Sequence, residues 1–219
     1  MRDVKIDEAW IAGAHDYVRQ YMLGTIRTQQ ETLAQCHRDI VEVAVLLVRR
    51  YRQGGKLLLC GNGGNAATCE HIAGELVSAL NHDVERPGLP ALPLSQTSST
   101  LTGHANDFDF SLIFERQVEA FGQPDDVLIG ISTSGSSKNV AAAMRLAQRR
   151  GLHTVGLLGM DAGAVSEASD LCVRVPSRST QFIQEAHMAI GHMLCAFVEE
   201  SLYTEATMPR LAVPATEAG

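Results

Sequence analysis

Two pairs of side chains in this sequence have the types and spacing needed to bind a metal ion or to move a proton. His71 and Glu75 are four residues apart in a segment with helical patterning, so they share one helix face. Gln184 and His192 are eight residues apart on the last expected helix, a spacing that turns only about 80° around the helix axis. The two pairs offer nitrogen and oxygen ligands for zinc or a similar divalent ion, and the same groups suit general acid–base catalysis.

Each pair also has a simpler structural interpretation. His71 and Glu75 fit a surface ion pair, and an isolated histidine such as His192 is more often a packing residue than a ligand. Glu185 and His187 lie on the same expected helix as Gln184 and His192. Periodicity alone therefore does not decide which side chains of that helix face a site.

Two loops rich in small and polar residues follow two of the expected strands. The loop Gly61–Asn65 has three glycines, which let the backbone approach a ligand closely. The loop Ser132–Ser137 has four serines and a threonine ahead of a helix, where free amides and the helix dipole favour an anion. In an open parallel sheet, ligands bind beyond the carboxyl ends of the strands, and we expect both loops there.

The kind of anion follows from what these loops lack. Neither has the GxGxxG dinucleotide pattern or the GxxxxGK[ST] phosphate loop, so a phosphomonoester is favoured over a nucleoside triphosphate. Ordinary turn chemistry is the alternative for either loop alone, with Ser137 acting only as a helix cap. Two such loops on one sheet are harder to explain in that way.

The elements that must position these residues alternate between strand and helix after a long first helix. That helix is expected over about 8–53. The expected strands are 56–60, 91–94, 127–131, 153–158 and 171–175, and the expected shorter helices are 66–80, 97–105, 113–120, 138–150 and 184–203. This order predicts one α/β domain over 1–219, a three-layer doubly wound parallel sheet, with a flexible tail over 204–219.

Composition narrows the function classes. The 18 basic and 25 acidic residues give a net charge of −7, which argues against a nucleic-acid partner. No apolar run is long enough to cross a membrane, and the first residues do not resemble a signal peptide. The five cysteines show no metal-binding spacing, so we expect reduced, mostly buried thiols in a cytoplasmic protein.

In ordered motifs over about residues 15–203, the chain resembles the sugar isomerase (SIS) domain family and, within it, the bacterial phosphoheptose isomerases. The matching segments are Cys60–Gly64, His71-x-x-x-Glu75-Leu76, Arg86-Pro87, Ala105–Phe108, Gly130–Gly135, Val175–Ser177 and Ile183-Gln184-Glu185-x-His187. The resemblance implies a flavodoxin-like topology and a long N-terminal helix. It also implies the isomerisation of D-sedoheptulose 7-phosphate to D-glycero-D-manno-heptose 7-phosphate through an enediol.

The resemblance also assigns roles to particular residues. Phosphate would be bound by Ser132, Thr133, Ser134 and Ser137, and the sugar by Asn62, Gly63, Gly64, Asn106, Asp107 and Gln184. One Zn²⁺ per subunit would be held by His71, Glu75, Gln184 and His192, with Glu75 and His192 as the acid–base pair. The apolar surface of the first and last helices predicts an oligomer, and the resemblance implies a homotetramer whose sites form between subunits.

Three departures from the family pattern leave the substrate open. Asn65 replaces a usual serine, Phe182 replaces the arginine usual before Ile-Gln-Glu, and Ala79 stands where some members have arginine. The alternatives are an isomerase for another sugar phosphate, a non-catalytic SIS scaffold that binds the bacterial replication initiator, and a regulatory module that senses a phosphosugar. The intact His/Glu and Gln/His pairs favour the isomerase, because a scaffold has no chemical need for them.

Overall fold

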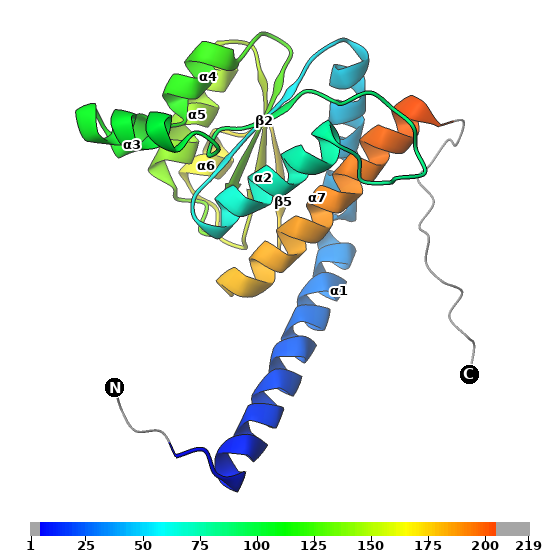
Figure 1. Cartoon of the computed structure of the whole chain (residues 1–219), viewed down its shortest axis with the longest axis vertical. Helices are drawn as coiled ribbons and strands as arrows, with labels where there is room; N and C mark the ends of the chain where they lie inside the picture. Colours follow the sequence, from blue (N-terminus) through cyan, green and yellow to red (C-terminus); the bar gives the residue numbers. More distant parts are fainter. Residues whose placement is uncertain (1–4, 205–219) are drawn as a thin grey trace.

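The computed structural model describes residues 5–204. Figure 1 shows its elements in chain order. The helices are α1 (Glu8–Arg52), α2 (Gly64–Val77), α3 (Ser98–Asp107), the 3-10 helix η1 (Phe110–Leu112), α4 (Glu115–Phe121), α5 (Lys138–Arg149), α6 (Ala164–Glu167) and α7 (Thr180–Tyr203). The strands are β1 (Leu57–Gly61), β2 (Ala91–Pro93), β3 (Val127–Ser132), β4 (His153–Leu158) and β5 (Leu171–Arg174).

The five strands form one parallel sheet in the order β2-β1-β3-β4-β5. This is the flavodoxin-like order, and it confirms the predicted α/β fold with a long N-terminal helix. The chain reverses its direction of winding between β1 and β3, which are hydrogen-bonded neighbours with Cys60 opposite Gly130. Such a reversal opens a crevice at the carboxyl ends of the two strands, where both polar loops begin.

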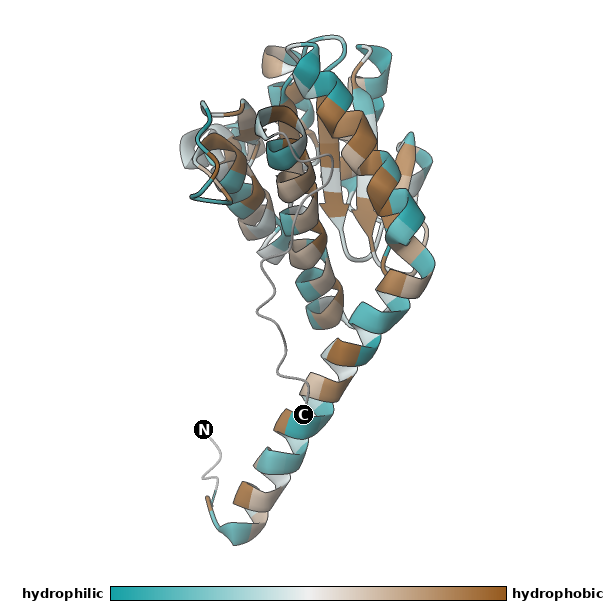
Figure 2. Ribbon diagram, turned by 90° about the vertical axis from the view of Figure 1, so that its right-hand side faces the viewer, coloured by the Kyte–Doolittle hydropathy of each residue, from teal (hydrophilic) through white to brown (hydrophobic). Residues whose placement is uncertain are grey.

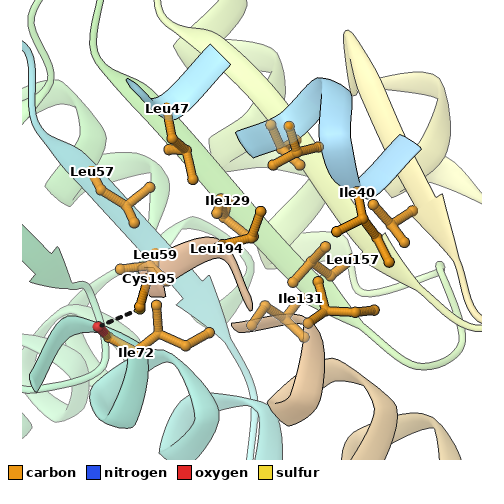
Figure 3. Close-up of a cluster of buried hydrophobic side chains, with 14 of the residues drawn as sticks. Ile40, Leu47, Leu57, Leu59, Ile72, Ile129, Ile131, Leu157, Leu194 and Cys195 are labelled. Carbon is orange, nitrogen blue, oxygen red and sulfur yellow. Dashed lines mark hydrogen bonds between the residues drawn. The ribbon is translucent and has the colours of Figure 1, made fainter. Parts of the chain in front are cut away.

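Helices cover both faces of the sheet because alternate strand residues point to opposite sides. On one face, α1, α2 and α7 bury a large apolar cluster against β1, β3 and β4, part of which is drawn in Figure 3. On the other face, α4, α5 and α6 pack on the alternate strand residues, such as Leu58 and Leu128. The three-layer arrangement therefore follows from strands that are apolar on both sides.

The structure differs from the expected elements in several places. Helix α7 begins at Thr180, one turn before Gln184, so Gln184 lies within the first turns of the helix. The helix expected over 113–120 is α4, which begins two residues later at Glu115, and the short helices η1 and α6 were not predicted. These three pieces have seven residues or fewer, which is too short to show a helical period in the sequence. The tail expected over 204–219 lies, apart from Thr204, outside the described residues.

Helix α1 runs well past the rest of the fold, as Figure 1 shows. From Tyr21 onwards it contacts α7 and then the sheet. Its N-terminal part carries exposed apolar residues, and apolar positions are brown on the ribbon of Figure 2. Over the described residues, no helix is both long enough and apolar enough to span a membrane. The five cysteines are unpaired and four of them are buried, as predicted.

Candidate functional site

The two polar loops meet at the crevice between β1 and β3. Gly63 has a φ of 57°, a left-handed conformation that glycine adopts without strain, and it turns the chain from β1 into α2. Gly135 has a φ of 67° in the second loop, before α5 begins at Lys138. Two amide side chains join the loops, because Asn62 and Asn139 exchange hydrogen bonds of 2.9 and 2.8 Å.

The serine-rich loop is held by its own hydroxyl groups. Ser132 Oγ and Ser137 Oγ are 3.0 Å apart, and Ser134 Oγ and Ser136 Oγ are 2.9 Å apart. Ser134 is exposed, Thr133 and Ser137 are half-buried, and Ser132 is buried at the end of β3. A cluster of hydroxyls beside a helix N-terminus can bind an anion without a lysine or arginine side chain.

The structure brings three of the predicted metal and catalytic residues together. The Nε2 atoms of His71 on α2 and His192 on α7 are 2.8 Å apart, and His71 Nε2 is 3.3 Å from Glu75 Oε1. One ligand atom from each of these residues lies within 4.8 Å of the other two. Two imidazole nitrogens and a carboxylate oxygen this close form a donor set that fits zinc. His71 thus takes part in more than a surface ion pair.

Gln184 lies beside the first loop. Its Nε2 donates to Asn65 Oδ1 at 3.4 Å, and a Cβ on Gly64 would come within 2.7 Å of the same nitrogen. The amide therefore lies close to the backbone of Gly64.

The other polar residues of α7 that periodicity left open have different partners. His187 is fully buried, where its Nε2 lies 3.1 Å from the Leu158 carbonyl, and burial lowers its pKa to about 4. The carboxylate of Glu185 accepts hydrogen bonds from Tyr21 and Thr25 of α1, both at 2.7 Å. These contacts leave His192 as the α7 histidine that faces α2.

Over the described residues, no cysteine sulfur belongs to the same cluster. Burial raises the pKa of the Cys195 thiol to about 12 and raises that of Cys69 well above its usual range, because burial favours the neutral form.

A buried ion pair fixes α2 against α7 near the cluster. Arg86 Nε donates to Glu199 Oε2 at 2.6 Å, and both side chains are 1% exposed. Arg86 also donates to the carbonyls of Glu75 and Leu76 at the end of α2, and Glu199 accepts from the backbone amides of Leu80 and Asn81. These bonds satisfy the free carbonyls of α2 and explain why it ends at Val77, before the predicted residue 80.

Asn106 and Asp107 are exposed at the end of α3, where Asn106 Nδ2 donates to Asp107 Oδ1 at 2.8 Å. Helix α3 packs mainly on η1. The assignment of Asn106 and Asp107 to the sugar stays a prediction.

Comparison with known proteins places this site in a family. The model of the SIS domain matches residues 20–159. The phosphoheptose isomerase of Aneurinibacillus thermoaerophilus is 42% identical over 191 residues, which are 86% of this chain and 96% of that protein. The chain belongs to the phosphoheptose isomerase family of SIS-domain proteins.

Two further relatives agree with this placement. The phosphoheptose isomerase of Roseiflexus sp. is 49% identical over 166 residues, which are 76% of this chain and 83% of that protein. The solved structure of a phosphoheptose isomerase from Francisella tularensis superposes with a TM-score of 0.82 at 33% identity and covers 85% of this chain and 98% of that one. The similarity therefore extends over nearly the whole length of these relatives.

Within this phosphoheptose isomerase fold, the three departures have different surroundings. Asn65 is buried and reaches Gln184, a contact that a shorter serine side chain would not make. Phe182 packs edge-on against Tyr21 with ring centroids 5.1 Å apart, and its ring lies over Gly24, so it helps to attach α7 to α1. Ala79 is half-buried just after α2.

Sequence reasoning missed two residues that shape the site. Asn139 bonds to Asn62, although it follows the serine-rich loop and its position at the start of a helix gave a weak signal. Gly191 lets α7 approach α2, because a Cβ there would come within 2.6 Å of Ile72. No sequence signal marked Gly191, because its importance depends on a contact between two helices far apart in the chain.

Proposed function

We propose that this protein is a phosphoheptose isomerase, which converts D-sedoheptulose 7-phosphate to D-glycero-D-manno-heptose 7-phosphate through an enediol. The observation that carries the proposal is the convergence of His71, Glu75 and His192 from two helices. The reaction moves one proton from C1 to C2 and one from the C1 hydroxyl to the C2 oxygen. It therefore needs a base beside the carbons and a proton carrier beside the oxygens.

Glu75 is the base and His192 the proton carrier in this proposal. The Glu75 carboxylate takes the proton from C1 and returns it to C2, and His192 moves a proton between the two oxygens. His71 lies within hydrogen-bonding distance of His192 and close to Glu75, so it holds both groups in place. The loop Ser132–Ser137 binds the phosphate far from the reacting carbons, and this binding energy orients the substrate.

One Zn²⁺ per subunit is proposed at His71, Glu75 and His192, with Gln184 as the fourth ligand implied by the family resemblance. When bound, zinc would supply positive charge that stabilises the negative oxygen formed during proton transfer. The proposal is supported by the donor set and by its close spacing.

A cytoplasmic homotetramer is the proposed working form. The exposed apolar residues on the N-terminal part of α1 support an oligomer, because a monomer would leave them in water. Asn106 and Asp107 are proposed to bind sugar in such an assembly.

The test is turnover of D-sedoheptulose 7-phosphate by the purified protein, after metal removal and with or without added Zn²⁺, for wild type and Glu75→Gln. We expect the substitution to lower kcat by at least about 100-fold, because the amide cannot accept the proton. The matched control is Glu70→Gln, since Glu70 is an exposed glutamate on the same helix whose carboxylate accepts a hydrogen bond from Ser95. Its kcat should stay within about twofold of wild type.

The opposite outcome has a clear meaning. If the folded, zinc-loaded wild type does not turn over this substrate, the assignment fails and other ketose phosphates are tested next. If none is converted, the scaffold or phosphosugar-sensing alternative replaces the isomerase.

A further inference from the structure

The two ligand loops are joined by one pair of amide side chains. Asn62 Nδ2 donates to Asn139 Oδ1 at 2.9 Å, and Asn139 Nδ2 donates to Asn62 Oδ1 at 2.8 Å. Asn62 follows β1 in the glycine-rich loop, and Asn139 is the second residue of α5, directly after the serine-rich loop. The pair therefore connects segments that are 77 positions apart in the sequence.

The orientation of this pair is set by the backbone. Asn139 Oδ1 also accepts a hydrogen bond of 2.9 Å from the backbone amide of Val140. The Val140 N–H needs an acceptor, so the atom of the Asn139 amide beside it must be the oxygen and the other atom must be the NH₂ nitrogen. That NH₂ group faces the side chain of Asn62 and donates to Asn62 Oδ1. The Asn62 amide is thereby fixed with its nitrogen towards Asn139 Oδ1.

Burial makes the pair costly to break. Asn139 is 3% exposed and sits next to Val140 and Ala141, which are completely buried. A buried amide that loses its partner keeps its desolvation cost, so Asn139 strongly favours the geometry in which Asn62 is bonded. Asn62 is only half-buried, and its amide has one further N–H and one further lone pair, which no group of residues 5–204 takes up and which a ligand in the crevice could use.

The same arrangement positions the serine-rich loop. Asn139 lies two residues after Ser137, whose Oγ is 3.0 Å from Ser132 Oγ across the loop. Anchoring Asn139 to Asn62 therefore fixes the distance between the anion-binding hydroxyls and the glycine-rich loop. A substrate that is held at both loops would gain from this fixed spacing, because less motion is lost on binding.

We propose that Asn139 is a positioning residue, which orients Asn62 towards the sugar and keeps the two loops in register for a phosphorylated ligand. This inference rests on the proposed function for its substrate, but its effect on phosphate binding does not require turnover. A purely structural role would instead affect only the stability of the fold.

The test compares Asn139→Leu with Gln117→Leu. Gln117 is also a buried amide, 5% exposed, and its Nε2 donates to the carbonyls of Leu94 and Ile113, which belong to neither loop. Both substitutions remove a buried amide and should lower Tm. The dissociation constant of inorganic phosphate is measured by calorimetry, and kcat and KM are measured with sedoheptulose 7-phosphate.

We expect Asn139→Leu to raise the phosphate dissociation constant and KM by about tenfold or more, with a smaller change in kcat. Gln117→Leu should leave all three within about twofold. Asn139→Ser is the second variant in case the leucine does not fold, because serine is polar but too short to reach Asn62. If the Asn139 variants match Gln117→Leu in phosphate affinity and KM, the positioning role is wrong. If wild type binds phosphate but turns over no sugar phosphate, the proposed function fails and phosphate affinity alone decides this inference.

Discussion

His187 and His192 are five residues apart on α7 but lie in opposite environments. Five residues turn a helix by about 140°, so one side chain faces the sheet while the other faces α2. His187 is buried against Leu158, whereas His192 meets His71 at 2.8 Å. A buried imidazole is held neutral because burial disfavours the charged form. His187 therefore has a structural role and His192 is available for chemistry.

The buried state of His187 predicts a loss of stability in acid. Burial lowers its pKa from 6.5 to about 4 in the folded protein, so between these values the unfolded chain binds a proton that the folded chain does not. The contribution of His187 is therefore complete above pH 6.5 and is lost as the pH falls towards 4, by about 3 kcal/mol. Urea unfolding from pH 7.5 to 4.5 should show a loss about 2 kcal/mol larger for wild type than for His187→Gln, which does not titrate. Equal pH dependence of the two proteins would contradict this assignment.

Two helices, α2 and α7, bring the catalytic side chains together, and their closeness depends on Gly191. A Cβ at this position would come within 2.6 Å of Cδ1 and Cγ1 of Ile72. Ile72 directly follows His71 and Gly191 directly precedes His192, so the contact that sets the helix spacing also sets the distance between the two histidines. The ion pair of Arg86 and Glu199 fixes the same two helices farther along.

Replacing Gly191 with alanine should therefore affect both stability and metal binding. The added methyl overpacks the α2–α7 contact, at a cost of about 1–3 kcal/mol in unfolding free energy. It should also weaken zinc binding, measured by competition with a chelator, because the histidines move apart. Adding Ile72→Val to Gly191→Ala should restore part of the lost stability and part of the lost zinc affinity. Gly74→Ala, also on α2, is the control, because a Cβ at Gly74 would meet nothing within 4 Å. Wild-type zinc affinity in Gly191→Ala would show that the helix spacing does not control the site.

In the molecule as a whole, α1 carries apolar side chains that the described residues, 5–204, leave exposed. Leu23 and Ile26 are 57% and 49% exposed, and Leu33 farther along is 70% exposed. Figures 1 and 2 show the N-terminal part of α1 extending beyond the sheet. Apolar residues arranged along a helix in this way are typical of a surface that packs against another helix.

Introducing charge on this surface should break the proposed assembly. Leu23→Asp combined with Ile26→Asp should convert the homotetramer into smaller species, seen as a lower mass by light scattering after gel filtration. The reason is that a buried unpaired carboxylate is costly in an interface. Gln35→Asp, at an exposed polar position about 120° around the helix axis from Leu23 and about 180° from Ile26, should leave the mass unchanged. An unchanged mass for the double variant would show that this face is not an interface.

The fold class and much of the site follow from local features of the sequence. Apolar strands that alternate with helices predicted the parallel sheet, and the position of each polar loop after a strand predicted that both lie at one edge. The spacing of His71 and Glu75 placed them on one helix face, and the ordered motifs indicated the family. These features are local, because they depend on helix and strand periodicity and on short segments of chain.

Which residues far apart in the chain contact one another depends on how the helices and strands pack. Periodicity did not choose between His187 and His192, because the choice depends on which face of α7 packs on the sheet. The bond between Asn139 and Asn62, the burial of Arg86 with Glu199 and the contact of Gly191 with Ile72 join segments far apart in the chain. Such pairs form because a buried polar group needs a partner and because close-packed helices leave no room for extra atoms, and both conditions arise only when the elements pack.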